Sequence, residues 1–233
     1  MHVFSFSRLN MYTNCPRRFY YKYVLNLSES VTVPLLLGKA CHKAIELMVH
    51  GASKREAMVA GLAEIDFEAI PFKDYDYLMS NVPSIRTGET EKYFCLPLSA
   101  DGSVQIQGYI DWTNGNELMD WKTNRKIYAV QDNPQLALYS WAISQLTGHT
   151  TIQASLYFLR FRKEISYRYS IADMEQARRW AEQLAKQIQQ IVAQLNGTQQ
   201  DVALFPSCPN KLCEYCPFAT NCYRDNQEMR KVQ

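Results

Sequence analysis

The sequence has no hydrophobic run long enough to cross a bilayer and no large excess of charge of either sign. Its 233 residues carry a formal net charge of +2, which by itself indicates neither nucleic acid nor a membrane surface as a partner. The first residues lack the basic and then apolar pattern of a signal peptide, so we expect a cytoplasmic, reducing location and no membrane partner. Repeats and low-complexity tracts are also absent. The composition suits one domain over residues 1–233.

The hydrophobic period changes along the chain. Helical spacing over residues 35–51 and 54–70 precedes three short segments rich in β-formers, at 91–98, 104–113 and 117–123. Pro134 then opens a helix, and two strands at 151–161 and 164–171, a long helix from Asp173 and an aperiodic tail follow. This order predicts the α/β class, with a central mixed sheet flanked by helices.

Two acids lie in otherwise apolar strands within GYIDWTNGNELMDWKTNRK. Asp111 is near the end of one strand, and Asp120 and Lys122 are two apart on the next, so these two side chains point to the same face. A hairpin can bring Asp111 close to Asp120, and two carboxylates about 4 Å apart repel unless a hard cation binds them. With Lys122 holding or deprotonating a water, the set suits phosphodiester hydrolysis assisted by Mg²⁺ or Mn²⁺.

The alternative is an exposed Asp120–Lys122 ion pair, with Asp111 capping a turn. Surface charge pairs are common, so this would be the simpler interpretation of an isolated D-x-K. The apolar neighbours Trp112 and Trp121 argue against it, because two acids placed among them need a function. Glu91, just ahead of the first strand, is a further carboxylate that can join the set.

Seven cysteines are more than a chain of this size needs for stability, and a reducing location favours metal binding over disulfides. The tail places Cys208, Cys213, Cys216 and Cys222 within fifteen residues. Four local thiolates can form a closed zinc site unaided. Cys41 and Cys95 lie in apolar helix and strand contexts, and we interpret them as core residues.

One more cysteine stands alone near the amino terminus. Cys15 precedes Pro16 inside a helical pattern that Ser5 or Ser7 can cap. The proline predicts either a break at Cys15 or a new helix that begins at Pro16.

In order along the chain, SFSRLNMYTNCPRRFYYKYVL, GKACHKAIE, GYID, DWKTNRK and QLALY resemble the motifs of RecB-like exonucleases within the PD-(D/E)xK superfamily. The members most similar in size and layout are CRISPR-associated RecB-like exonucleases, the nuclease domain of AddB and stand-alone phage or bacterial proteins. The resemblance implies a restriction-endonuclease-like core over about 35–195. Segments 1–30 and 200–233 would then join at an iron–sulfur cluster.

The resemblance also implies a role for each matching residue. Asp111 and Asp120 would be metal carboxylates, Lys122 the catalytic lysine, and His42 and the Trp121 carbonyl further metal ligands. Gln135 and Tyr139 match the Q-x-x-x-Y motif and would contact DNA phosphate or orient the site. As single residues, His42, Gln135 and Tyr139 would each be interpreted as core residues.

The tail also matches the iron–sulfur members. Cys213, Cys216 and Cys222 have their C-x2-C-x5-C spacing, and Cys15 matches their amino-terminal C-P motif, which implies a structural [4Fe–4S] cluster. Cys208 departs from the pattern and leaves open a site local to the tail.

Taken together, the motifs predict a metal-dependent DNA exonuclease acting on single strands or free ends. The alternative is a DNA-processing subunit that works with CRISPR-adaptation or recombination proteins. Arg17, Arg18, Lys22 and the tyrosines around them can line a path for the strand. Alternatively, the tyrosines pack around the cluster and the three basic side chains are solvated.

Overall fold

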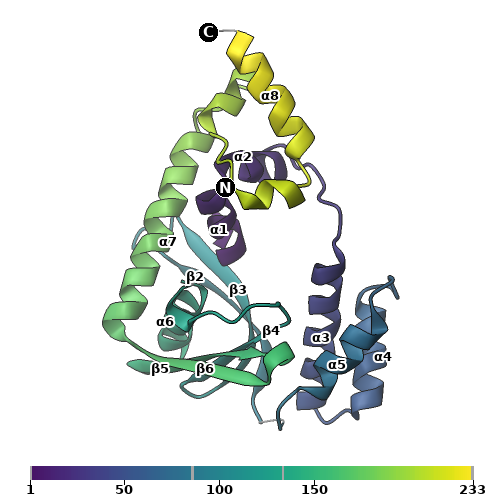
Figure 1. Ribbon diagram of the computed structural model, residues 1–233. Coiled ribbons are helices and arrows are strands. Elements are labelled where there is room, and N and C mark those ends of the chain that lie inside the picture. Colours follow the sequence, from purple (N-terminus) through teal and green to yellow (C-terminus); the bar gives the residue numbers. More distant parts are fainter. Residues whose placement is uncertain (1, 85–86, 133, 232–233) are drawn as a thin grey trace. The chain divides into compact units, whose positions relative to one another are not determined.

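The computed structural model describes residues 2–84, 87–132 and 134–231 (Figure 1). The chain forms two compact units. The terminal unit comprises Met1–Ser30, Pro97–Gln107 and Trp180–Gln233, and the sheet unit comprises Val31–Leu96 and Gly108–Arg179. Each unit is therefore built from segments that are distant in the sequence.

The strands form a mixed sheet in the order β1-β3-β4-β5-β6, and β2 also pairs with β3. They are β1 Val3–Ser5, β2 Glu89–Pro97, β3 Gln105–Asn114, β4 Glu117–Lys122, β5 Thr151–Phe158 and β6 Lys163–Ser170. The short β1 runs parallel to the first residues of β3, which lie in the terminal unit. Within the sheet unit, β4 is antiparallel to β3 and parallel to β5, and β6 is antiparallel to β5. The predicted α/β class with a central mixed sheet flanked by helices is confirmed.

The β3–β4 hairpin places the two acids. Gly115 has a φ of +59°, the left-handed conformation that a tight turn needs, and the strands pair from there through Trp112 and Met119. Asp111 and Asp120 are the next residues beyond this last pair. The turn expected at NGN therefore sets the register that brings the two acids level.

The helices of the sheet unit are α3 Val33–Val49, α4 Lys54–Glu64, α5 Phe72–Ser80, α6 Gln135–Thr147 and the first part of α7 Ile171–Val192. The first three pack together over one face of the strands, and their shared core includes Trp112, Met119, Trp121 and Tyr157. The Tyr75 hydroxyl donates to the carbonyls of Ala40 and Met58, which links α5 to α3 and α4. α6 packs against β5. In the described part of the chain, no helix combines the length and apolarity that a bilayer crossing needs.

The terminal unit holds α1 Phe6–Asn14, α2 Pro16–Phe19, a π-helical turn at Tyr20–Val24, short 3₁₀ turns at Gln199–Leu204 and Lys211–Tyr215, and α8 Ala219–Lys231. Further 3₁₀ turns at Val130–Asp132 and Leu159–Phe161 belong to the sheet unit. Ser5 caps α1 by accepting from the Arg8 N–H. Cys15, in extended conformation, ends α1 and precedes α2, whose first residue is Pro16. Of the two alternatives for this proline, the structure has the new helix start.

Four local expectations are corrected. The second helix ends at Glu64 because Asp66 and Phe67 take positive φ, and Pro71 caps the following α5 rather than ending α4. The tail is not aperiodic throughout, since α8 occupies its last part. The strand β1 was missed because three residues are too few for a period. Cys41 is buried as expected, but Cys95 is exposed.

We predict opposite effects for alanine at two helical glycines. A Cβ at Gly61 would overlap the Ala40 carbonyl oxygen and the Tyr75 hydroxyl, whereas a Cβ at Gly38 would lie 3.7 Å from Thr123 Oγ1, an ordinary contact. Gly61→Ala should lower the free energy of unfolding by about 1–3 kcal/mol through overpacking. Gly38→Ala should raise it by up to about 1 kcal/mol through helix propensity. Thermal and denaturant melts of the two variants check this, and equal stabilities would contradict the close α3–α4 packing.

Candidate active site

The two acids of the hairpin are almost enclosed. The side chains of Asp111 and Asp120 are 13% and 7% exposed. The Asp111 carboxylate accepts from the Trp121 N–H at 2.8 Å, which takes up a backbone donor just beyond the paired part of the hairpin. Burial raises the pKa of Asp120, and the neighbouring Asp111 charge raises it further. Two buried carboxylates held this close are stable only where positive charge compensates them.

His42 of α3 supplies part of that charge. Its Nδ1 lies 3.3 Å from Asp111 Oδ2, and its Nε2 lies 2.9 Å from the Trp121 carbonyl oxygen. Burial lowers the pKa of His42, but Asp111 outweighs it and the pKa is raised to about 9. Burial likewise would raise the pKa of Asp111, but His42 and the Trp121 N–H hold it below its ordinary value.

Lys122 supplies the rest of the positive charge that compensates the two acids. Its Nζ lies 2.6 Å from Asp120 Oδ2, and although burial disfavours the ammonium, Asp120 raises the lysine pKa above its ordinary value. Apart from this ion pair, Asp120 Oδ2 is a buried oxygen with no further polar partner among the described residues. Carboxylate oxygens, a carbonyl oxygen and an imidazole nitrogen are suitable ligands for Mg²⁺ or Mn²⁺. The residues present therefore fit a divalent cation.

A family model described as the PD-(D/E)XK nuclease superfamily matches residues 3–223. The chain belongs to this superfamily. The match covers both acids, His42 and Lys122, and members of the superfamily are metal-dependent nucleases, so a metal-dependent nuclease activity on DNA follows from membership.

Other comparisons add resemblance only. A solved structure titled "Crystal structure of SSO0001" is 16% identical, with a TM-score of 0.45, over 94% of this chain and 84% of that chain. A search among curated proteins finds no match to this sequence.

Glu91 brings a third carboxylate to the candidate site. Ligand atoms of His42, Glu91 and Asp111 all lie within 4.8 Å of one another. Glu91 has a φ of +47°, a conformation rare for a residue with a side chain, and strain of this kind gathers at functional sites. Burial and the charge of Asp111 raise the pKa of Glu91. Its position ahead of a strand was the only sequence signal, and it does not reveal this backbone conformation.

Gln135 and Tyr139 lie one turn apart on α6 and are joined by a side-chain hydrogen bond. Tyr139 is buried, packs edge-on against Phe94 and feels the charges of Asp120 and Asp111, and burial raises its pKa to about 12. The close approach depends on Gly108, where a Cβ would lie 3.0 Å from the Tyr139 hydroxyl oxygen. Gln135 and Tyr139 of the Q-x-x-x-Y motif therefore lie together beside the two acids.

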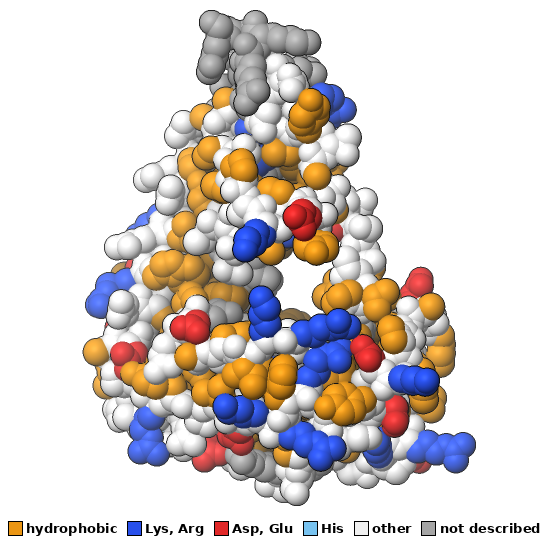
Figure 2. Space-filling model, in the orientation of Figure 1, with side chains coloured by type: hydrophobic (Ala, Val, Ile, Leu, Met, Phe, Trp, Pro, Cys, Tyr) orange, Lys and Arg blue, Asp and Glu red, His pale blue; other side chains and the backbone are white. Residues whose placement is uncertain are grey.

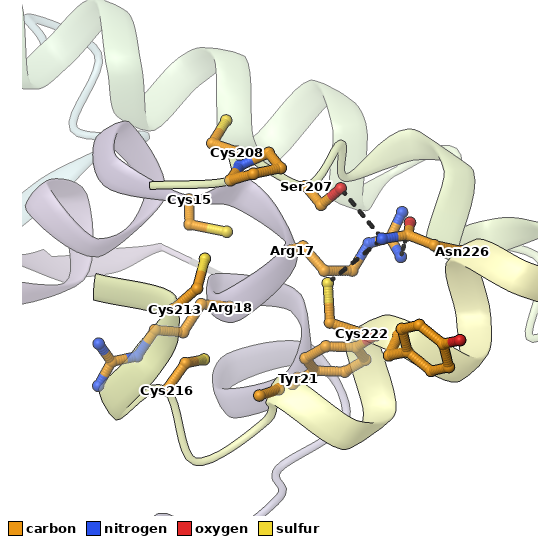
Figure 3. Close-up of a pocket in the computed structure, with 13 residues that line it drawn as sticks. Cys15, Arg17, Arg18, Tyr21, Ser207, Cys208, Cys213, Cys216, Cys222 and Asn226 are labelled. Carbon is orange, nitrogen blue, oxygen red and sulfur yellow. Dashed lines mark hydrogen bonds between the residues drawn. The ribbon is translucent and has the colours of Figure 1, made fainter. Parts of the chain in front are cut away.

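A second cluster of metal-binding side chains lies in the terminal unit. A cavity of about 200 Å³ is lined by Cys15, Cys208, Cys213, Cys216 and Cys222. Figure 3 shows the sulfur atoms of Cys15, Cys213, Cys216 and Cys222 pointing into a common space, while that of Cys208 points away from it. Backbone and side-chain N–H groups of Asn210 and Asn226 donate to the Cys213 and Cys222 sulfurs.

Contact with DNA was expected for Arg17, Arg18 and Lys22. This expectation is corrected for one of them. Arg17 is 2% exposed and donates to the Phe205 carbonyl at 2.7 Å and to Asn226 at 3.5 Å, so its guanidinium supports the cysteine cavity and is not available to DNA. Arg18 and Lys22 both pair with Glu29. Their contact with DNA stays a prediction.

The aromatic residues of the same segment are structural. Tyr20 stacks on Phe205 and Tyr21 packs on Phe218, with centroid separations of 4.8 and 5.5 Å. This is the alternative in which the tyrosines pack around the cysteines.

We predict that Glu91→Gln weakens the binding of Mn²⁺ by roughly tenfold or more, because a carboxylate facing the site loses its charge. Glu46→Gln is the matched control, since Glu46 lies one turn after His42 on α3 but pairs with Lys43 at 2.9 Å. Titration of Mn²⁺ followed by electron paramagnetic resonance measures both. Equal affinities in the two variants would remove Glu91 from the metal site.

Proposed function

We propose that this protein is a RecB-like DNA exonuclease that hydrolyses phosphodiester bonds in single strands or at free ends. The observation that carries the proposal is the enclosed pair Asp111 and Asp120, which His42 and Lys122 compensate. The order of the RecB-like motifs along the whole chain supports the subfamily and the preference for ends. A cytoplasmic location remains part of this expectation.

Asp111, Asp120, His42 and the Trp121 carbonyl would hold Mg²⁺ or Mn²⁺, with Glu91 as a further carboxylate. When bound, the cation neutralises charge that develops on the scissile phosphate and favours attack by water. Without it, four anionic or dipolar oxygens would repel a phosphate. Both nitrogens of the His42 ring are engaged, one by Asp111 and the other by the Trp121 carbonyl, so His42 must lose a proton and one of these contacts before it can bind a cation.

Lys122 stabilises charge in this arrangement. Its ammonium is held at 2.6 Å from Asp120, and a protonated lysine donates hydrogen bonds to water or to a phosphate oxygen but does not accept a proton. Gln135 and Tyr139 orient the site, because their mutual hydrogen bond fixes one face of α6 beside the acids. Arg125 and Lys126, both exposed just beyond β4, add positive charge for the phosphate backbone, and Figure 2 shows Lys and Arg side chains grouped on the drawn face of this unit.

We expect Lys122→Ala to reduce Mn²⁺-dependent degradation of single-stranded DNA by at least about 100-fold, as loss of a group that stabilises developing charge does. Lys163→Ala, at the exposed start of β6, is the matched control and should keep full activity. The assay uses strands labelled at the 5′ or 3′ end together with circular single strands. Unchanged activity of Lys122→Ala would exclude its role, and cleavage of the circles as fast as of linear strands would exclude an exonuclease.

We further propose that the cysteine cavity of the terminal unit holds a structural [4Fe–4S] cluster ligated by Cys15, Cys213, Cys216 and Cys222. Two observations support it. The four sulfurs point into one space in Figure 3, and the four residues line one cavity of the terminal unit. The direction of Cys208 supports its omission from the ligands.

The cluster predicts a brown protein after anaerobic purification, with about four iron atoms per chain. Cys15→Ser should lower the iron content by half or more and lower the melting temperature, because one ligand joins the first helices to the tail. Cys208→Ser should keep the iron content and stability of the unsubstituted protein. Iron and zinc analysis of each variant checks this, and a colourless protein with stoichiometric zinc would contradict the cluster.

A further inference from the structure

We propose that Tyr93 and Tyr109 form a stacking platform for unpaired nucleobases beside the metal site. The inference rests on the proposed function and deepens it by naming the surface that would recognise the unpaired bases. The two tyrosines are called the tyrosine platform below.

The platform consists of two exposed rings in contact. Tyr93 on β2 is 50% exposed and Tyr109 on β3 is 58% exposed, although both lie within strands. Their ring centroids are 5.1 Å apart and their planes are inclined by 47°. Each ring therefore contacts the other and keeps about half of its surface in solvent.

The strand pattern places both rings beside the acids. Along β3, residues from Gln105 to Trp112 alternate between a more open face and a buried face, and Tyr109 shares the more open face with Asp111, whose carboxylate is itself almost enclosed. Residues two apart on a strand are separated by about 6.8 Å. Tyr93 follows Glu91 by two residues on β2, and the carboxylates of Glu91 and Asp111 meet within 4.8 Å. Tyr109 therefore lies on the same face of β3 as Asp111, and Tyr93 joins it there through the ring contact.

The opposite face of the same strands has an ordinary structural purpose. Phe94 is buried against Tyr139, and Gly108 gives both of them room. Large aromatic side chains on the open face have no such core to fill. Their exposure keeps aromatic ring surface in contact with solvent beside the site.

Charge decides which part of a nucleic acid fits there. Glu91 and Asp111 are adjacent to the platform and repel phosphates that lack a cation, so the rings suit the uncharged bases. Stacking on aromatic side chains tolerates any base, but it needs a base whose face is free. Bases inside a duplex have both faces covered, so the platform selects strands that are single or frayed at the end.

The experiment compares two fluorescent oligonucleotides of equal length, oligo(dT) and an abasic strand with the same phosphates, with Ca²⁺ in place of Mg²⁺ to prevent turnover. The variants are Tyr93→Ala/Tyr109→Ala, Tyr93→Phe/Tyr109→Phe, and Tyr77→Ala, a similarly exposed tyrosine on α5 of the same unit. The alanine pair should weaken binding of oligo(dT) by at least about fivefold, since one stacked base contributes about 5- to 150-fold. Its affinity for the abasic strand should not change. The phenylalanine pair and Tyr77→Ala should bind both strands as the unsubstituted protein does.

Two results would overturn the platform. The first is unchanged binding of oligo(dT) by the alanine pair, which would indicate that the rings contact a protein partner instead. The second is an equal loss of affinity for oligo(dT) and for the abasic strand. Thermal melts of the alanine pair identify any loss that comes from unfolding, and in that case the single variants Tyr93→Ala and Tyr109→Ala replace it. Activity of the unsubstituted protein with Mn²⁺ separates the two proposals. If it degrades oligo(dT) and the alanine pair does so with the same KM, the platform is wrong and the nuclease assignment stands.

Discussion

The structure of the sheet unit depends on the burial of two carboxylates that repel each other. Asp111 and Asp120 are level because the β3–β4 register is set by the turn at Gly115. An uncompensated pair of buried charges would cost several kcal/mol, so the surrounding residues must supply positive charge and donors. His42 reaches Asp111 from α3, and Lys122 reaches Asp120 from the same strand. The same residues are the ones proposed to bind a cation and to act on a phosphate.

The rest of the unit keeps these groups in place. α3 can present His42 because its other face is packed on α4 and α5, a contact that requires Gly61 and is tied by the Tyr75 hydroxyl. On the far side of the hairpin, Gly108 lets Tyr139 approach the acids. Two glycines therefore serve the site without touching a ligand, by allowing backbone and aromatic groups to come close. At both positions the neighbouring groups leave no room for a side chain, so helix or strand propensity does not decide which residue fits there.

The terminal unit solves a different problem, which is to join segments far apart in the sequence. Cys15 lies in an extended residue between two helices, and Arg17 is buried beneath the tail with its guanidinium on the Phe205 carbonyl. Aromatic stacking between Tyr20 and Phe205 adds apolar contact. Five cysteines then line one cavity. A buried arginine here has a clear physical reason, since the carbonyls at the end of a short 3₁₀ turn need donors.

The sequence by itself determined the elements whose signals are local: the hairpin turn at Gly115 and the spacing that puts Asp120 and Lys122 on one face. For Pro16 it left two alternatives, and the structure has the new helix start. The ordered motifs determined the superfamily, because several short patterns in the right order rarely coincide. Tertiary structure alone decided what depends on burial and on chain reversal. It turned Arg17 inward, left Cys95 exposed, brought Glu91 to the acids through a positive φ, and paired Tyr93 with Tyr109. No local period encodes these outcomes, because each arises from contacts between residues that are distant in the sequence.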